Sequence, residues 1–376
     1  MENQAPQSLI DHFSTIDDPR IDRTKLHQLI DILVIAICAT ICGAEGWEDF
    51  ELFGNCKHDW FKTFLDLPNG IPSHDTFRRV FARLDPTQFQ QAFLDWVRSV
   101  TTLTQGEVVA LDGKQLRRSQ DRAAGKSAIA MVSAWAQENR LVLGQVRVDE
   151  KSNEITAIPE LLKILEISGC IVTLDAMGCQ TEIAKTVVEK RADYVLAVKG
   201  NQVTLLEDLQ EYFDWALADK FQQTRYTKDE TVDGDHGRIE VRRCYATEDC
   251  EWLRRKAEWQ GLRSIAMVES ARSVGEQEAG HERRYYISRL SADAQELNRV
   301  IRSHWSIENS LHWVLDIAFR EDDSRIRKDH APENMATLRH IALNLLKQDK
   351  SIKVGIKSKR KNAGWDERYL LKVLNG

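Results

Sequence analysis

The chain has 376 residues, of which 42% are hydrophobic and 29% charged, and its formal net charge is −6. This composition is typical of a folded globular protein with room for two or three domains, and it excludes a disordered chain. The charge is unevenly spread, because residues 323–376 hold 13 Lys and Arg against 6 Asp and Glu. A basic end on an acidic protein suits a polyanionic partner, although a solvated terminus would have the same composition.

The cysteines and the apolar runs indicate where the protein resides. None of the 7 cysteines forms a CxxC pair, so we expect reduced thiols, no structural zinc site and a cytoplasmic protein. The segment Met1–Ser8 is polar, which predicts no signal peptide. The longest apolar run, residues 29–44, contains Asp31 and is shorter than the roughly 20 residues that span a bilayer. We therefore expect a buried helix there and no membrane partner.

Apolar residues at helical spacing predict an all-helical N-terminal domain over residues 1–103, with helices near 26–42, 47–65, 73–84 and 87–102. Ser73 is a good N-cap, and Pro86 lies just beyond the end of the helix that Ser73 opens. That helix carries Arg78 and Arg79, and with the turn before it could form a helix-turn-helix that reads DNA. The alternative is a plain helical bundle with a charged outer face.

From about residue 104 the pattern changes to β-rich runs at 106–116, 127–137 and 141–151, followed by alternating helices and strands up to residue 200. The order β-β-β-α-β-α-β predicts an α/β fold, a ribonuclease-H-like mixed sheet with flanking helices. The expected divisions are the first part of this core at 104–223, a β-rich insertion at 224–292, core helices at 293–348 and a basic C-terminal tail at 349–376.

Two of the predicted strands end in Leu-Asp followed by a small residue, in "VVALDG" and "IVTLDA". In a ribonuclease-H-like sheet these strands are neighbours, which would bring Asp112 and Asp175 side by side. Two carboxylates held that close destabilise each other unless a cation or a proton lies between them, and Mg²⁺ suits oxygen ligands. The alternative for Asp175 is a structural aspartate in a turn.

A third carboxylate is expected from the helix over the sheet, in "HWSIENSLHWVLD". Glu308 has core-like neighbours, and a carboxylate among them is costly unless something such as a metal ion compensates it. His312, one turn later, would share its face. The alternative is that Glu308 binds no metal and instead pairs with Arg302 or His304. Rival third ligands are Asp316 and Glu321.

These segments belong to a wider set of motifs, which includes "GIPSHDTFRRVF", "LDGKQLRRS", "TLDAMGCQTEIA" and "FREDDSRIR". With them the sequence resembles the bacterial insertion-sequence transposases with an Asp-Asp-Glu site, in the ISAs-type branch that includes the H-repeat-associated proteins. The resemblance covers nearly the whole chain and implies that Asp112, Asp175 and Glu308 are catalytic and bind metal. The Tyr, Arg and Lys that often surround this Glu are absent. Their positions hold Ile301, His304 and Leu315.

The resemblance implies a DNA transposase that cleaves the ends of an insertion sequence and joins the 3′-hydroxyl ends to target DNA. It implies two Mg²⁺ ions, with Mn²⁺ as a substitute, and double-stranded DNA as the partner of a homo-oligomer. In this scheme Asp112 and Asp175 hold one ion, and Asp112 and Glu308 hold the other. The alternatives are an inactive DNA-binding relic and a ribonuclease-H-like nuclease that cuts structured nucleic acid without joining strands.

Basic residues near the acids are candidate DNA contacts. Lys114 lies two residues beyond Asp112, Lys199 ends the last core strand, and Arg238 lies on the insertion. Solvated surface charge is the alternative for each of them. Trp305 and Trp313 could stack on a base, but we expect them to pack inside the protein.

Overall fold

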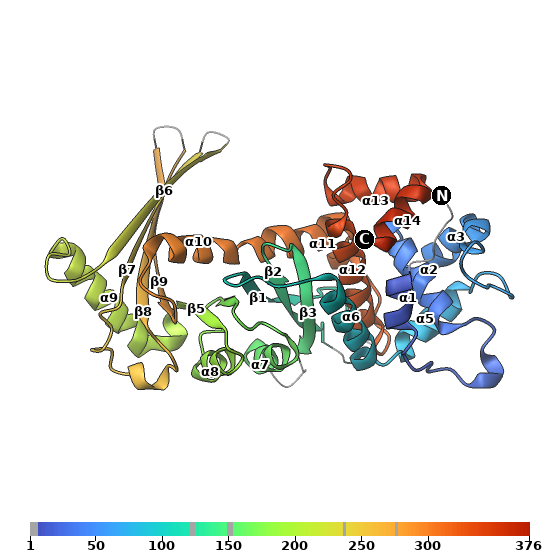
Figure 1. The fold of residues 1–376 in the computed structure, drawn as a ribbon, viewed down its shortest axis with the longest axis horizontal. Coiled ribbons are helices and arrows are strands. Elements are labelled where there is room, and N and C mark those ends of the chain that lie inside the picture. The colour runs from blue at the N-terminus through green and yellow to red at the C-terminus, as the bar shows by residue number, and fades with distance from the viewer. Residues whose placement is uncertain (1–6, 121–124, 126, 149–152, 236–237, 275–276) are drawn as a thin grey trace.

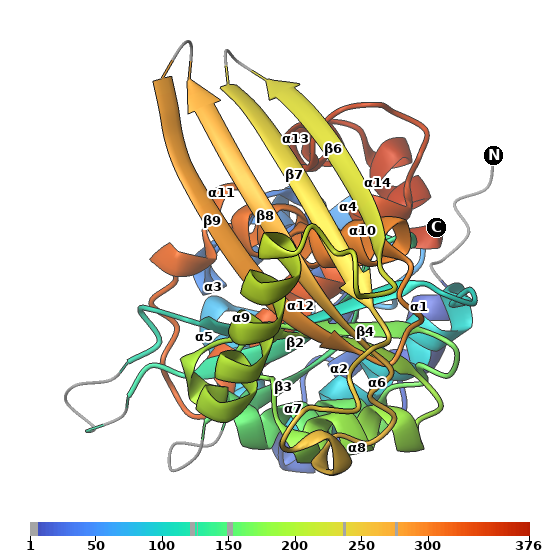
Figure 2. The ribbon, with the colours of Figure 1, turned by 90° about the vertical axis from the view of Figure 1, so that its left-hand side faces the viewer.

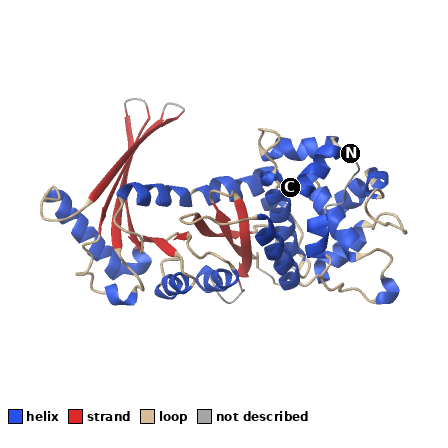
Figure 3. Cartoon of the chain, in the orientation of Figure 1, coloured by secondary structure: helices blue, strands red, loops and turns tan. Residues whose placement is uncertain are grey.

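The computed structural model describes residues 7–120, 125, 127–148, 153–235, 238–274 and 277–376. Figure 1 shows an elongated molecule with a helical part at one end, a mixed sheet in the middle and long strands projecting at the other end. The helices and strands are distinguished in Figure 3. The predicted α/β class, with a ribonuclease-H-like mixed sheet, flanking helices and an all-helical N-terminal part, is confirmed.

The N-terminal part is helical as predicted, although the expected helix at 47–65 is broken at Lys57. Ser73 does cap the helix that follows it, because its Oγ accepts a hydrogen bond from the Thr76 N–H. The helices are α1 (Gln7–Phe13), η1 (Asp22–Thr24), α2 (Leu29–Cys42), α3 (Trp47–Cys56), α4 (His58–Phe61), α5 (His74–Arg83) and α6 (Pro86–Val100).

Helix α6 has a strong start signal. Asp85 Oδ1 accepts a hydrogen bond from the Thr87 N–H at 2.8 Å, and Pro86 occupies the first helical position. We expect Asp85→Ala to lower the free energy of unfolding by about 1 kcal/mol, because an N–H of the first turn loses its acceptor. Urea denaturation measures this loss. Asp59→Ala, at an exposed aspartate that caps no helix, is the control, and equal losses in the two variants would contradict the assignment.

Among the described residues the sheet has nine strands in the order β3-β2-β1-β4-β5-β9-β8-β7-β6. β1 pairs in parallel with β4 and antiparallel with β2, and β4 pairs in parallel with β5. The predicted neighbourhood of the first and fourth strands is therefore present. The core strands are β1 (Val108–Gln115), β2 (Ala130–Ala136), β3 (Leu141–Val148), β4 (Ile171–Leu174) and β5 (Asp193–Val198).

The β-rich region after residue 224 continues this sheet, because β9 pairs antiparallel with β5. Its strands are longer than those of the core and project from the body as a twisted blade (Figure 2). The region predicted to be β-rich contains four strands among the described residues. The blade consists of β6 (Thr227–Asp235), β7 (Arg238–Thr247), β8 (Ser264–Val274) and β9 (Gln277–Ser288).

Helices cover both faces of the sheet. α7 and α8 lie on one face, and the long helical run of α10 and α11 crosses the other (Figure 1). The apolar stripe of α10 packs against β1, β4 and β5, which holds this run close to the ends of the core strands. The helices here are α7 (Glu154–Ile164), α8 (Thr181–Glu189), η2 (Gly200–Gln202), α9 (Val203–Ala218), η3 (Lys256–Glu258), α10 (Ala294–His304), η4 (Glu308–His312), α11 (Trp313–Ala318) and η5 (Glu321–Asp323).

Residues 349–376, expected as a basic tail, fold into α13 (Ile356–Trp365) and α14 (Glu367–Asn375), which pack against α2. The preceding helix, α12 (Ala331–Gln348), is buried. Arg360 Nη2 donates to the Thr40 carbonyl at 2.8 Å, and Lys359 Nζ donates to the Leu346 carbonyl at 2.9 Å. Because both cations are buried and satisfy carbonyls near helix C-termini, part of the basic character of this segment serves folding.

The cysteines are free thiols, and most of them are buried. The buried free cysteines are Cys38, Cys170, Cys179, Cys244 and Cys250. Cys42 is half-buried and Cys56 exposed, and both are also free. Among the described residues no single helix is long and apolar enough to cross a membrane, and the bent pair of α2 and α3 meets that test by length and composition only.

Candidate active site

Asp112 lies on β1 directly after four buried residues. In the parallel pairing of β1 with β4, Leu111 lies opposite Leu174, so Asp112 and Asp175 follow at the same edge. All four paired residues of each strand are buried, and the helices on both faces of the sheet hold the two strands in this pairing. The two aspartates therefore reach one edge of the sheet by strand pairing alone, as the sequence predicts.

Asp175 is the first residue after β4, and it contacts both the turn that follows and a cavity. Its Oδ1 accepts hydrogen bonds from the Met177 N–H at 3.0 Å and the Gly178 N–H at 3.3 Å, so it does stabilise the turn that follows the strand. It also lines a cavity at the sheet edge. The turn role considered for Asp175 is thus present, and the carboxylate is held in place while it faces the cavity.

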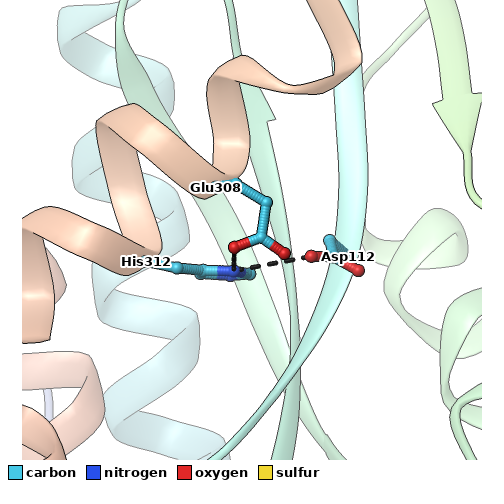
Figure 4. Close-up of side chains that lie close together, drawn as sticks. All are labelled: Asp112, Glu308 and His312. Atoms are coloured by element: carbon cyan, nitrogen blue, oxygen red, sulfur yellow. Dashed lines mark ion pairs between the residues drawn. The ribbon is translucent and has the colours of Figure 1, made fainter. Parts of the chain in front are cut away.

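Glu308 comes from the helical run on the other side of this edge. Between α10 and α11 the helix widens to a π-helical turn over Glu308–His312, a rare geometry that is frequent at functional sites. Figure 4 shows Glu308 and His312 directed toward Asp112. His312 Nδ1 lies 3.4 Å from Asp112 Oδ2 and 3.5 Å from Glu308 Oε2. The residues Ile307 and Leu311 are fully buried and anchor the turn.

A cavity of about 190 Å³ lies where these elements meet. Asp112, Asp175 and Glu308 all line it, so three acids that are far apart in the sequence share one space. Its wall also contains Lys199 and Arg284, which place positive charge in the same cavity. An anionic group could therefore contact cations while it lies beside the carboxylates.

The acids disturb each other's ionisation. The pKa of Asp112 is raised, first by burial and then by the hydrogen bond and the negative charge of Glu308. The pKa of Glu308 is lowered, first by its hydrogen bond with His312. The charge of Asp175 raises the pKa of Asp112 further. A proton therefore stays on Asp112 more readily than on a free aspartate, which is the behaviour of acids crowded together without a compensating cation.

The side chains present fit a divalent metal ion. Ligand atoms of Asp112, Glu308 and His312 all lie within 4.8 Å of one another. Carboxylate oxygens are the ligands of Mg²⁺ and Mn²⁺, and an imidazole nitrogen is a common ligand of transition metals. Asp175 lies outside this tight group but faces the same cavity.

Comparison with known proteins identifies the family. Residues 103–345 match the family described as Transposase DDE domain, and residues 10–97 match the one described as DDE_Tnp_1-associated. The chain belongs to the transposase DDE domain family. The predicted resemblance to insertion-sequence transposases is therefore confirmed.

Relatives of this chain align with it over nearly its whole length. "Putative transposase YncI" of Escherichia coli O157:H7 is 42% identical over 374 residues, which is 98% of this chain and 94% of the relative. "H repeat-associated putative transposase YhhI" of E. coli K12 is 42% identical over 98% of both chains. This chain is also similar to the piggyBac transposase in a cryo-EM structure of its synaptic complex with hairpin DNA. The alignment covers 98% of this chain and 79% of the piggyBac chain, with 12% sequence identity and a TM-score of 0.46.

In this transposase-family chain, Lys114 points into the protein. Its side chain is 12% exposed, its Nζ lies 3.0 Å from Glu321 Oε2, and it also forms an ion pair with Asp316. Glu321 is buried and pairs in addition with Arg339. The ammonium is thus engaged inside the protein, and we reassign Lys114 from a phosphate contact to a residue that ties α11 and η5 to β1. It thereby connects the strand that carries Asp112 to the helical run that carries Glu308.

The groups considered as alternatives around Glu308 are engaged elsewhere. Asp316, the rival third ligand, pairs with Lys114. Arg302 forms an ion pair with Asp233 of the blade. His304 Nδ1 lies within hydrogen-bond distance of Thr173 Oγ1, at 3.0 Å. Glu308 is therefore the carboxylate of this helical run that lies with Asp112.

The other predicted DNA contacts lie at the surface or outside the described side chains. Lys199 is exposed and lines the cavity. Arg78 and Arg79 are exposed on α5, where Arg78 Nη2 donates to Asp75 at 2.7 Å. Arg238 begins β7, but its side chain lies outside the described residues.

The tryptophans of the helical run differ from the expectation. Trp305 is 45% exposed and Trp313 is 60% exposed, so neither is packed inside the protein. Trp305 lines the cavity and lies under the Arg284 guanidinium, 5.0 Å from the ring centre. The helical run buries a narrower stripe than its composition indicates, because the indole rings lie on the solvent side of Ile307 and Leu311.

Glu154 is a residue that sequence reasoning missed. It begins α7, and a Cβ added to Gly113 would lie 2.1 Å from its Oε1. The pKa of Glu154 is raised by burial and then by the charge of Asp175. The glycine of "LDGK" therefore leaves room for a further carboxylate near the site, and the glycine itself was the available signal.

Proposed function

We propose that this chain is a DNA transposase that cleaves phosphodiester bonds at the ends of an insertion sequence and joins the 3′-hydroxyl ends to target DNA. The observation that carries the proposal is the shared cavity of Asp112, Asp175 and Glu308 in a chain of the transposase DDE domain family. The names of the relatives, both transposases, support it.

In this proposal the three carboxylates hold two divalent ions, and Asp112 is a ligand of both. Asp112 with Asp175 would hold one divalent ion, and Asp112 with Glu308 would hold a second, with Mg²⁺ as the natural ion and Mn²⁺ as a substitute. Such ions supply Lewis acidity and lower the pKa of bound water. The protein's own part is to fix the three carboxylates on two strands and one helix, so that little reorganisation is needed during reaction.

The chemistry is an in-line displacement at phosphorus. A water oxygen attacks the phosphorus at the element end, the bond to the 3′ oxygen breaks, and a 3′-hydroxyl is released. In the second step that hydroxyl loses its proton and attacks a target phosphodiester, the bond from this phosphorus to the 3′ oxygen of the target strand breaks, and the 3′ oxygen leaves with a proton. Lys199, in the wall of the cavity, would contact a phosphate oxygen in both steps.

Double-stranded DNA is the proposed partner, bound by a homo-oligomer. Arg78 and Arg79 on α5 lie exposed on the helical part, in the helix that the sequence analysis considers for DNA reading. Arg238, on the blade, remains a candidate contact. Phosphate contacts of this kind position DNA without reading its sequence.

Cleavage of end DNA tests the proposal. Linear DNA carrying the sequences that flank the coding region is incubated with the protein in Mg²⁺, in Mn²⁺ and in EDTA. We expect nicking or cutting at a defined position with either ion and none with EDTA. Binding without any cleavage would favour the inactive relic, and cleavage of structured DNA without strand joining would favour the nuclease.

A single phosphate contact can be tested through salt dependence. We expect Lys199→Gln to reduce the slope of log Kobs against log salt by about one, since one phosphate contact is lost. Fluorescence anisotropy with duplex DNA in EDTA measures this without cleavage. Lys185→Gln, on α8 at the opposite face of the sheet, is the control and should leave the slope unchanged. An unchanged slope for Lys199→Gln would remove Lys199 from the interface.

A further inference from the structure

His312 lies between two acids of the site, and both separations are longer than a strong hydrogen bond. Its Nδ1 is 3.4 Å from Asp112 Oδ2 and 3.5 Å from Glu308 Oε2. A charge-assisted N–H···O bond is shorter, about 2.7–2.9 Å. The ring nitrogen therefore points at the space between the carboxylates (Figure 4).

The separations suit a shared metal ion after a small contraction. An ion about 2.1 Å from each ligand, in the octahedral geometry that Mg²⁺ and Mn²⁺ prefer, would place neighbouring ligand atoms about 3.0 Å apart. The two measured separations are longer, at 3.4 and 3.5 Å. A contraction of about 0.5 Å at each pair would therefore bring the imidazole and both carboxylates to ligand distance.

The imidazole is also held in position. The side chain of His312 is only 6% exposed. The Lys114 Nζ approaches its carbonyl at 3.5 Å, and the neighbouring Leu311 and Leu315 are buried. The π-helical turn places Glu308 and His312 on one side of the helix, above Asp112. A ring fixed in this way loses little freedom when it binds an ion.

We propose that His312 Nδ1 is a third protein ligand of the divalent ion held by Asp112 and Glu308, so that this position has two oxygen donors and one nitrogen donor. The proposal rests on the metal site of the proposed function. A nitrogen donor suits transition metals better than Mg²⁺ or Ca²⁺, so the site should bind Mn²⁺ and Co²⁺ more tightly than Mg²⁺.

Electron spin echo spectroscopy of the Mn²⁺-loaded protein tests this without any reaction, because it detects a nitrogen bonded to the ion. We expect nitrogen modulation in the wild type, with frequencies that change when histidine is labelled with ¹⁵N. In His312→Gln we expect the modulation to be lost and the Kd for Mn²⁺ to rise about tenfold or more. In the matched variant His304→Gln, whose ring contacts Thr173, we expect the modulation to remain.

The outcomes separate this proposal from the function. Bound Mn²⁺ without nitrogen modulation in the wild type would overturn the histidine ligand and leave the proposed transposase intact. Modulation that persists in His312→Gln would overturn it as well. If His312→Gln fails to fold, the ¹⁵N-labelled wild type and His304→Gln decide, since loss of modulation in His304→Gln would assign the nitrogen to His304. Nitrogen modulation in a protein that cleaves no DNA would support the ligand and contradict the function.

Discussion

Asp112→Asn, Asp175→Asn and Glu308→Gln are each expected to reduce metal-dependent cleavage of end DNA by at least about 10³-fold. Each change removes one carboxylate charge from the cavity and keeps the size of the side chain. The fold should survive, because these acids crowd one another and the pKa of Asp112 is already raised by burial and by Glu308. Thermal unfolding in EDTA should therefore show that Asp112→Asn is as stable as the wild type or more stable, whereas Glu308→Gln should be slightly less stable because His312 lowers the pKa of Glu308.

The controls for this result are acids away from the site. Asp59→Asn and Glu182→Gln change fully or largely exposed carboxylates on α4 and α8, and they should leave the cleavage rate unchanged. Mn²⁺ should raise the unfolding temperature of the wild type more than that of Asp112→Asn, since only the wild type keeps all its ligands. Full cleavage by any one of the three variants would remove that residue from the proposed site.

Lys114→Met is expected to lower the free energy of unfolding by about 3 to 5 kcal/mol, because it leaves the buried Glu321 and the half-buried Asp316 without this cation. The loss should also reduce cleavage, since Lys114 ties the helical run that carries Glu308 to the strand that carries Asp112. Chemical denaturation in EDTA measures the stability term separately from metal binding.

Two further variants test whether the burial of its ion pairs causes the loss of stability in Lys114→Met. Lys57→Met breaks an ion pair in which Glu367 is 43% exposed, and it should cost no more than about 1 kcal/mol. The double variant Lys114→Met/Asp316→Asn should recover part of the loss, because the half-buried carboxylate is removed together with its cation while Glu321 keeps Arg339. Equal losses for Lys57→Met and Lys114→Met, with no recovery in the double variant, would show that Lys114 does not act through these ion pairs.

The sequence predicted the features that follow from regular hydrophobic patterns, which are the buried strands and their order in the sheet. The apolar runs before Asp112 and Asp175 specify buried parallel strands, and their pairing places the aspartates at one edge without any knowledge of side chains. Strand order was therefore accessible before the structure.

Features that depend on individual side-chain environments were not accessible. Lys114 follows the same strand as Asp112, yet only the position of Glu321 shows that its charge is buried. The tail residues Lys359 and Arg360 belong to the basic end that was expected to suit a polyanionic partner or to be solvated, but they donate hydrogen bonds to helix carbonyls. The exposed Trp305 was misjudged because composition does not show how narrow the buried stripe is.

The most direct test of the account is the location of Mn²⁺ in a crystal of the protein, from its anomalous scattering. The account predicts a peak in the cavity in contact with the carboxylates of Asp112 and Glu308, with Asp175 beside it. A crystal grown in saturating Mn²⁺ with no peak between these acids, or with Mn²⁺ bound only elsewhere, would contradict the central claim that they converge to hold a metal ion.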